Sequence, residues 1–187
     1  MKKMLLLVIC GLMLLGTALA EEPETRTVIS MIEGMEETVT LTRLDTGRGY
    51  EVWYDAQYFV LMPEDEGGGM DVLVPASEDA ELGIAFSVVA SGMTGPENVD
   101  LHAQAIADTL ADSGYEGVTP VDGIVLENAE LVAGYHGVQE GRVVQVNLVK
   151  AGEEYFTVTL EYPQEVAEGY GSRMTAMLQT FGPAKVD

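Results

Sequence analysis

The sequence predicts an α+β protein in which a mainly antiparallel β-sheet is packed by two amphipathic helices. Several short segments alternate apolar and polar residues with a period of two, as half-buried strands do. Residues 97–113 and 164–181 instead repeat apolar residues every three or four positions, as amphipathic helices do. The links between consecutive strands are short, and short links join antiparallel neighbours.

The clearest pattern covers the C-terminal third of the chain. Residues 142–150 and 154–162 alternate as two strands, and the glycine-bearing link 151–153 predicts a hairpin. Pro163 ends the second strand because it has no amide hydrogen to donate, and proline suits the first turn of a helix. The helix that follows has one apolar stripe, which consists of Val166, Tyr170, Met174, Met177, Leu178 and Phe181.

A hairpin is also expected at the start of the chain, from residues 25–32 and 37–44. Threonines alternate with Val39 and Leu41 there, which predicts a pair of strands at an exposed edge. Four more strands should follow, at residues 49–54, 58–62, 70–74 and 82–90. In the last of these strands, the side chains on the face opposite the apolar residues are small. We therefore expect a helix to pack closely on this face, which consists of Gly83, Ala85, Ser87 and Val89.

The rest of the predicted sheet lies between the two helices. The first helix, residues 97–113, has acidic residues in its first turn and ends at Gly114. Short strands are then expected at residues 115–119, 123–126 and 131–138. We find no internal repeat and no linker, so residues 21–187 should form a single domain.

The first 20 residues have the pattern of an export signal. A basic start is followed by an apolar segment and by the small residues Ala18 and Ala20 before Glu21. We expect cleavage after Ala20; an uncleaved anchor and a lipid anchor at Cys10 are the alternatives, but the apolar run continues past Cys10. No later stretch is apolar enough over a sufficient length to span a bilayer.

The composition of residues 21–187 narrows the possible functions. Cys10 is the only cysteine, so the cleaved chain has no disulfide, no thiolate nucleophile and no zinc site built on cysteine. Export without disulfides fits a bacterial protein of the periplasm, cell envelope or extracellular space. Removing Lys2 and Lys3 leaves 7 of the 9 basic residues against 31 acidic ones, a net charge of −24. Such a surface repels nucleic acids and anionic membranes.

The order of these elements resembles that of the PsbP-like family, whose fold is shared with the Mog family of Ran-binding proteins. The resemblance is carried by the segments GYEVWY and YFVLMP, by LGIAFSVV with the helix after it, by AGYHG before VVQVNLV, and by EYFTVTLEYP before the last helix. It spans residues 49–181 and leaves the hairpin at residues 25–44 outside, as a possible added arm. The resemblance implies an α/β/α sandwich and an exported module that binds a partner without catalysis.

The sequence offers little support for catalysis. His102 falls in the first helix and His136 in a strand, and no HExxH, GxSxG or phosphate-binding glycine motif is present. A small hydrolase would need a cleft that unites a histidine with carboxylates and a nucleophile. A divalent-cation module is the other alternative, because one loop carries four carboxylates that could bind calcium: Glu64, Asp65, Glu66 and Asp71. A mobile, solvated turn is the simpler interpretation of that loop, and no other cofactor is expected.

Two places could bind a partner. Trp53, the only tryptophan, either anchors the core or provides a platform for a ligand. The second place is the polar face of residues 154–162, provided that no helix covers it; this face consists of Tyr155, Thr157, Thr159 and Glu161. We therefore expect an exported, non-catalytic binding or adaptor module whose partner is a protein or another component of the cell envelope.

Overall fold

The structure, a computed structural model, describes residues 23–32, 34–93 and 98–185. The predicted export signal therefore lies outside the described residues. The two α-helices are α1 (Val99–Asp112) and α2 (Ser172–Gln179). The strands are β1 (Thr25–Ile32), β2 (Met35–Asp45), β3 (Tyr50–Tyr54), β4 (Phe59–Leu61), β5 (Asp71–Pro75), β6 (Ala85–Ala90), β7 (Glu116–Pro120), β8 (Glu130–Gln139), β9 (Arg142–Ala151), β10 (Glu154–Pro163) and β11 (Gly182–Pro183).

The strands form two sheets, and every pair of neighbours in the described chain is antiparallel. The large sheet has seven strands in the order β4-β5-β6-β10-β9-β8-β7, and the small sheet has four in the order β1-β2-β3-β11. The prediction of an α+β protein with a mainly antiparallel sheet is thus confirmed. The division into two sheets was not predicted.

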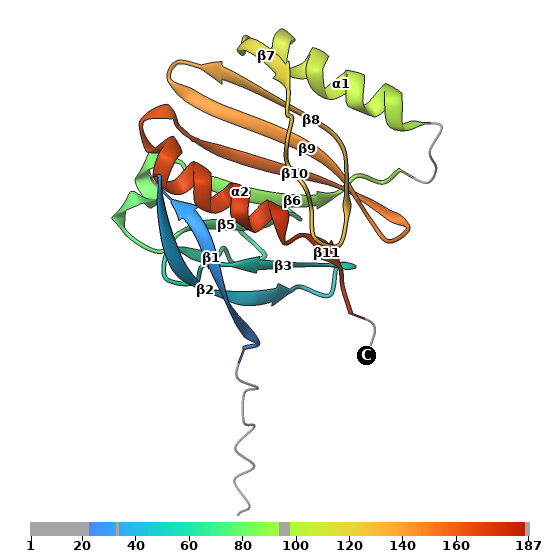
Figure 1. Ribbon diagram of the computed structural model, residues 1–187. Coiled ribbons are helices and arrows are strands. Elements are labelled where there is room, and N and C mark those ends of the chain that lie inside the picture. The colour runs from blue at the N-terminus through green and yellow to red at the C-terminus, as the bar shows by residue number, and fades with distance from the viewer. Residues whose placement is uncertain (1–22, 33, 94–97, 186–187) are drawn as a thin grey trace, which may run out of the picture.

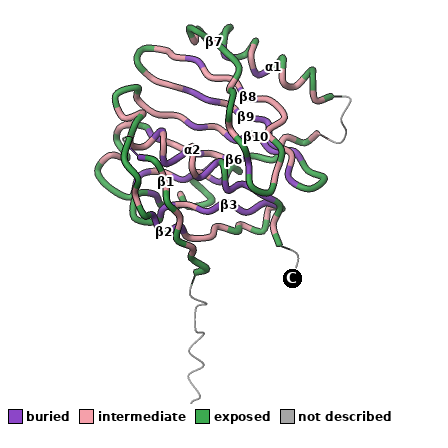
Figure 2. The backbone as a smooth tube through the Cα atoms, viewed as in Figure 1, coloured by how far each residue is buried: buried purple, intermediate pink, exposed green. Residues whose placement is uncertain are grey.

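The two helices lie on opposite faces of the large sheet (Figure 1). α1 packs beside β7 and β8 on the outer face, and α2 contacts β10 on one side and β1 and β3 on the other, so it lies between the two sheets. The main core forms around α2, where Met174, Met177 and Leu178 meet the inner side chains of the large sheet. Figure 2 shows the buried residues gathered in β3, β9 and β10, while β1 is largely exposed.

The leading hairpin is a structural part of the small sheet. β1 and β2 pair as predicted, and β2 also pairs with β3. The inward side chains Ile32, Val39 and Leu41 are buried in one cluster with Trp53. The hairpin is therefore integrated with β3 in one sheet and one apolar cluster.

The predicted helix over residues 164–181 is interrupted. It begins with a 3₁₀ turn at Gln164–Val166, continues as the π-helical turn η4 (Ala167–Gly171), and becomes α-helical only at Ser172–Gln179. A Cβ atom on Gly171 would lie 2.9 Å from the ring of Tyr162, so glycine permits the close approach of this turn to β10. The change of helix type could not be predicted, because the apolar residues recur at helical spacing throughout the segment.

The predicted strand at residues 123–126 is wrong. The segment between β7 and β8 is a loop in which Gly123 has a positive φ of 78°. Two of its apolar residues pack into the main core: Leu126 is buried and Ile124 is half-buried. A backbone hydrogen bond of 2.8 Å from Glu127 to Gln179 holds the loop against the end of α2. Core packing therefore explains the apolar residues here without a strand.

Phe181, directly after α2, joins the C-terminus to the core, and its loss should be costly. Its ring is fully buried, stacks on Tyr50 at a centroid distance of 5.0 Å, and lies 5.6 Å from the ring of Phe156. We expect Phe181→Ala to lower the free energy of unfolding by about 3–5 kcal/mol, measured by urea denaturation. Val125→Ala, at a side chain that is 77% exposed, should change it by less than about 0.5 kcal/mol. Equal losses in the two variants would contradict this description of the core.

Candidate binding surfaces

The predicted polar face of β10 lies on the outer side of the large sheet, and α1 covers only one end of it. Tyr155 is 8% exposed and packs with Ile106 and Leu110 of α1. Thr157 and Thr159, farther along the strand, are only half-buried, whereas Tyr155 is buried. The face is therefore divided into a covered end and an uncovered end.

The uncovered end extends across three more strands. The register places Val89 beside Thr157, Ser87 beside Thr159 and Val72 beside Ser87, and Val74 of β5 lies beside Val60 of β4. Val60 and Val89 are 45% and 37% exposed, and the others are half-buried. We call this surface of β4, β5, β6 and β10 the open face; it consists of Val60, Val72, Val74, Ser87, Val89, Thr157 and Thr159.

The helix expected on the small residues of β6 is not found among the described residues. α1 lies instead over β7, β8 and β9, where its side chains meet Val144 and Leu148. Those side chains offer more apolar surface to an amphipathic helix than Ser87 and Ala85 do. The small size of the β6 side chains predicted room for a helix, but the larger neighbours determine where α1 packs.

Glu161 closes one end of the open face together with an arginine. Nε of Arg142 donates to Glu161 Oε1 at 3.1 Å, and its Nη1 donates to the carbonyl oxygen of Leu82 at 2.8 Å. Glu161 thus already has a cationic partner within the chain. The open face itself carries no charged side chain.

Trp53 is a core residue and is not exposed as a platform for a ligand. Its side chain is buried with Val39 and Leu41, and its backbone N–H donates to Thr180 Oγ1 at 2.8 Å. The guanidinium of Arg26 lies 4.8 Å from the ring centroid and covers the remaining side. No face of the ring is left for a ligand of the kind the sequence allowed.

The four carboxylates of the predicted calcium loop are divided between the surface and the interior. Glu64, Asp65 and Glu66 are exposed, and Glu64 accepts a hydrogen bond of 2.9 Å from Arg48. Asp71 is buried at the start of β5. Within the described residues no group of three or more histidine, cysteine, aspartate or glutamate side chains is placed to hold a metal ion.

Asp71 holds together the start of β3, the turn before it and the start of β5. It accepts hydrogen bonds from the hydroxyl of Tyr50 at 2.6 Å and from Thr46 Oγ1 at 2.8 Å, and Nε of Arg48 lies 3.3 Å away. Burial raises the pKa of the Tyr50 phenol well above its usual range, and the hydrogen bond to Asp71 raises it further. Sequence reasoning could not see this pair, because the two residues are 21 positions apart.

The two histidines lie on different elements and in different surroundings. His102 of α1 lines an open groove of about 200 Å³ with Ile106 and Val146, and none of the described residues that line it is a carboxylate. His136 of β8 is hydrogen-bonded through Nε2 to Thr119 Oγ1 at 3.2 Å. Among the described residues, the hydrogen bond of His136 is to a threonine and the groove at His102 is mainly apolar, and a hydrolase would need a carboxylate and a nucleophile beside one of these histidines.

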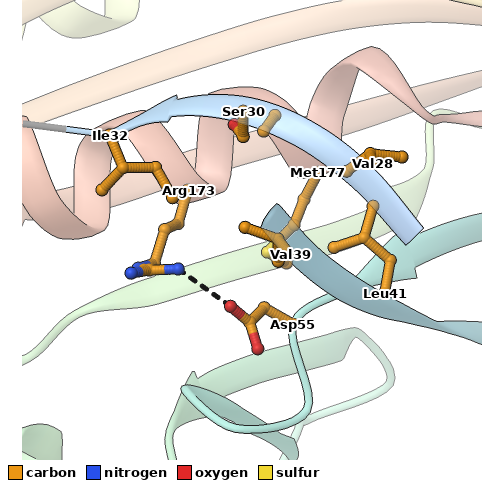
Figure 3. A pocket seen from close by; sticks show the side chains of 9 residues that line it. Val28, Ser30, Ile32, Val39, Leu41, Asp55, Arg173 and Met177 are labelled. Atoms are coloured by element: carbon orange, nitrogen blue, oxygen red, sulfur yellow. Dashed lines mark hydrogen bonds and ion pairs between the residues drawn. The ribbon is translucent and has the colours of Figure 1, made fainter. Parts of the chain in front are cut away.

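A buried arginine that the sequence did not single out joins α2 to the small sheet. Nη1 of Arg173 donates to Asp55 Oδ2 at 2.9 Å (Figure 3). Its Nη2 donates to Glu37 Oε2 at 3.1 Å. The guanidinium also lies 3.6 Å from the ring centroid of Tyr58. The apolar cavity beside it holds only about 10 Å³, too little for a ligand. The sequence could have indicated this burial, because Arg173 lies one helical turn before Met177 and therefore on the same face of the helix as that core residue.

A second pocket lies on the other side of Arg173, at η4. It has a volume of about 300 Å³, and two tyrosines and two glutamates line it: Tyr58, Tyr170, Glu165 and Glu168. Such a lining suits a cationic group. One tyrosine ring, that of Tyr58, already carries the guanidinium of Arg173, so the chain itself supplies one cation to this pocket.

The comparisons with known proteins concern the fold. No protein-family model matches the chain, and no curated protein matches it either. Among solved structures the chain is similar to the cyanobacterial PsbP protein CyanoP from Synechocystis sp. PCC 6803, with 16% sequence identity and a TM-score of 0.44 over 77% of this chain and 92% of that one. That protein comes from the family that the sequence of this chain resembles. Of the described helices, none has the length and hydropathy needed to cross a membrane.

The pair of Tyr50 and Asp71 predicts a loss of stability in alkali. Because the pKa of Tyr50 is raised in the folded protein, its contribution to stability is complete below about pH 10, the unfolded pKa, and is lost as the pH rises toward the folded pKa. One such tyrosine lowers the free energy of unfolding by about 1.4 kcal/mol per pH unit in that range. Urea denaturation between about pH 9 and pH 11 should therefore show a shallower decline for Tyr50→Phe than for the wild type.

Part of the decline should persist in that variant, because burial also raises the pKa of Tyr162 and of Tyr170. Tyr50→Phe also removes a hydrogen-bond partner of Asp71, which changes the free energy of unfolding at every pH. This difference is measured at neutral pH and subtracted. Identical slopes for the wild type and Tyr50→Phe would contradict the assignment.

Proposed function

We propose that the chain is an exported, non-catalytic binding module that receives a partner on its open face. The open face is the observation that carries the proposal. Four neighbouring strands present uncharged and mostly β-branched side chains on one side, in a chain whose net charge is −22. Val60 and Val89 are exposed there, and the other side chains are half-buried. Solvent-facing sides of antiparallel sheets are usually polar, and contiguous exposed apolar surface marks interaction sites.

The shape of this surface favours an amphipathic helix as the bound element. α1 forms one wall, and the groove between His102, Ile106 and Val146 continues from that wall onto the sheet. A helix laid beside α1 would cover Val89 and Thr157 and complete the outer layer over the large sheet. An amphipathic helix must bury its apolar stripe, and small side chains such as Ser87 let it approach closely.

The charge of the chain favours a basic partner. All five arginines take part in ion pairs with carboxylates of the chain, and Lys185 pairs with Glu24. Lys150 lies over the ring of Tyr155 at 5.8 Å. The excess of carboxylates is therefore not neutralised from within, and it would attract a basic partner and speed its association, an effect that salt weakens.

The proposal is tested by cross-linking at one position on the open face and one away from it. A photoreactive benzoylphenylalanine replaces Thr159 in one protein and Thr40, an exposed threonine on β2, in the other. After irradiation in envelope extracts of the producing cells, a discrete adduct should form from position 159 and not from position 40. Excess unlabelled wild type should compete it away, whereas Thr159→Arg should not and Thr40→Arg should.

Absence of an adduct at position 159, or the same adducts at both positions, would refute the open face as the binding surface. Thr159→Arg and Thr40→Arg place the same charge on an outward strand position, so the pair controls for charge. Melting curves of both variants identify any loss of folding.

A further inference from the structure

The free edge of β1 presents unpaired backbone groups. Among the described residues β1 pairs with β2 alone, at the end of the small sheet. In an antiparallel pair, every second residue is hydrogen-bonded to the neighbouring strand. The hydrogen bond of 2.8 Å from Arg43 N–H to the carbonyl of Glu24 shows that the even-numbered residues of β1 are the ones bonded to β2. The residues between them direct N–H and C=O groups away from β2: Thr25, Thr27, Ile29 and Met31.

Room for another strand exists beside this edge. A groove of about 460 Å³ separates β1 from η4, α2 and the end of β10, and it is bordered by Ile29, Ser30 and Met31 on the side of β1. The opposite side supplies polar groups that could bond to a backbone, namely Tyr162, Ser172, Thr175 and Gln179. Neighbouring strands in a sheet lie about 4.8 Å apart, so an extended chain can occupy such a groove.

The edge lacks the usual protection against strand addition. Proteins guard exposed edges with lysine, proline, bulges or short strands, but β1 runs for eight residues without lysine or proline. Its one charged side chain, Arg26, is turned toward Glu127 and the ring of Trp53. Ile29 and Met31 are 73% and 59% exposed, which leaves apolar side chains beside the free backbone.

We propose that β1 binds an extended segment of another protein by strand addition, and that this segment has β-branched residues in its middle and basic residues at its ends. The backbone groups of β1 supply the ladder, and Ile29 and Met31 contact alternate side chains of the added strand. Carboxylates flank the edge: the exposed Glu36 lies opposite Met31, and Glu24, which also pairs with Arg43 and Lys185, precedes β1. A second copy of this chain would bring the same net charge of −22, so charge favours a different and basic partner.

This surface is separate from the open face, which lies on the large sheet. The inference therefore goes beyond the function proposed above and does not depend on it.

The test uses two synthetic peptides and the backbone amides of β1. The first peptide has the sequence KTVTVTVK, and the second replaces both lysines with glutamate. At saturation with the lysine peptide, hydrogen exchange should slow at the amides of Thr27, Ile29 and Met31. The amides of Val28 and Ser30 are already bonded to β2 and should change little. The glutamate peptide should produce no slowing.

A pair of variants tests the same contact by affinity. Ile29→Pro removes an N–H that faces the free edge while leaving the β1–β2 ladder intact, and Ile29→Thr retains that N–H. The lysine peptide should bind about tenfold more weakly to Ile29→Pro, the equivalent of one hydrogen bond and its unsatisfied partner, and nearly unchanged to Ile29→Thr. Melting curves establish whether both variants fold. If Ile29→Pro does not fold, the hydrogen-exchange measurement on the wild type tests strand addition at β1 by itself.

Three results would overturn the proposal: no slowing at these amides with saturating lysine peptide, equal binding of the glutamate peptide, or equal affinities of the two variants. Protection of the same amides in concentrated protein without peptide, together with a dimer in sedimentation, would assign the edge to a second copy instead and also refute it.

Discussion

The arrangement of the two sheets depends on the burial of one arginine. A buried charge costs several kcal/mol unless it is paired, so the guanidinium of Arg173 requires its partners in place. Those partners belong to different segments: Glu37 lies on β2, Asp55 follows β3, and Tyr58 precedes β4. α2 can therefore lie between the sheets only when the hairpin and the β3–β4 link have docked on it. The free edge of β1 and the pocket at η4 both border this junction.

Much of the fold could be predicted because local patterns agree with the tertiary environment. β9 and β10 alternate as expected, and Pro163 ends the second strand. The strand predicted at residues 123–126 was wrong because tertiary packing, and not strand formation, requires apolar residues there. Ile124 and Leu126 are apolar because they lie in a loop that packs into the core. The division into two sheets depends on contacts between distant residues, such as the antiparallel pairing of Gly182 with Glu51, and no local pattern encodes those contacts.

The candidate site could be predicted only in part. Alternation correctly placed Thr157 and Thr159 on one face of a strand, but it could not show how far α1 would extend over that face. The carboxylates of residues 64–71 were grouped because they are close in sequence. The fold buries Asp71 against Tyr50 and leaves Glu64 exposed, with Arg48 paired to both. The free edge of β1 follows from the order of strands in the small sheet, which the sequence alone does not give.

The most direct test of this account is hydrogen exchange in Arg173→Met compared with the wild type and with Arg142→Met, a matched loss of an arginine that is paired on the large sheet. If Arg173 docks the hairpin on α2, its replacement should leave the buried Asp55 without its cationic partner and should accelerate exchange in β1 and β2, while β9 and β10 remain protected. Arg142→Met should leave the hairpin unchanged. Unaltered protection of β1 and β2 in Arg173→Met, or a uniform loss across both sheets, would contradict the central role given to this arginine.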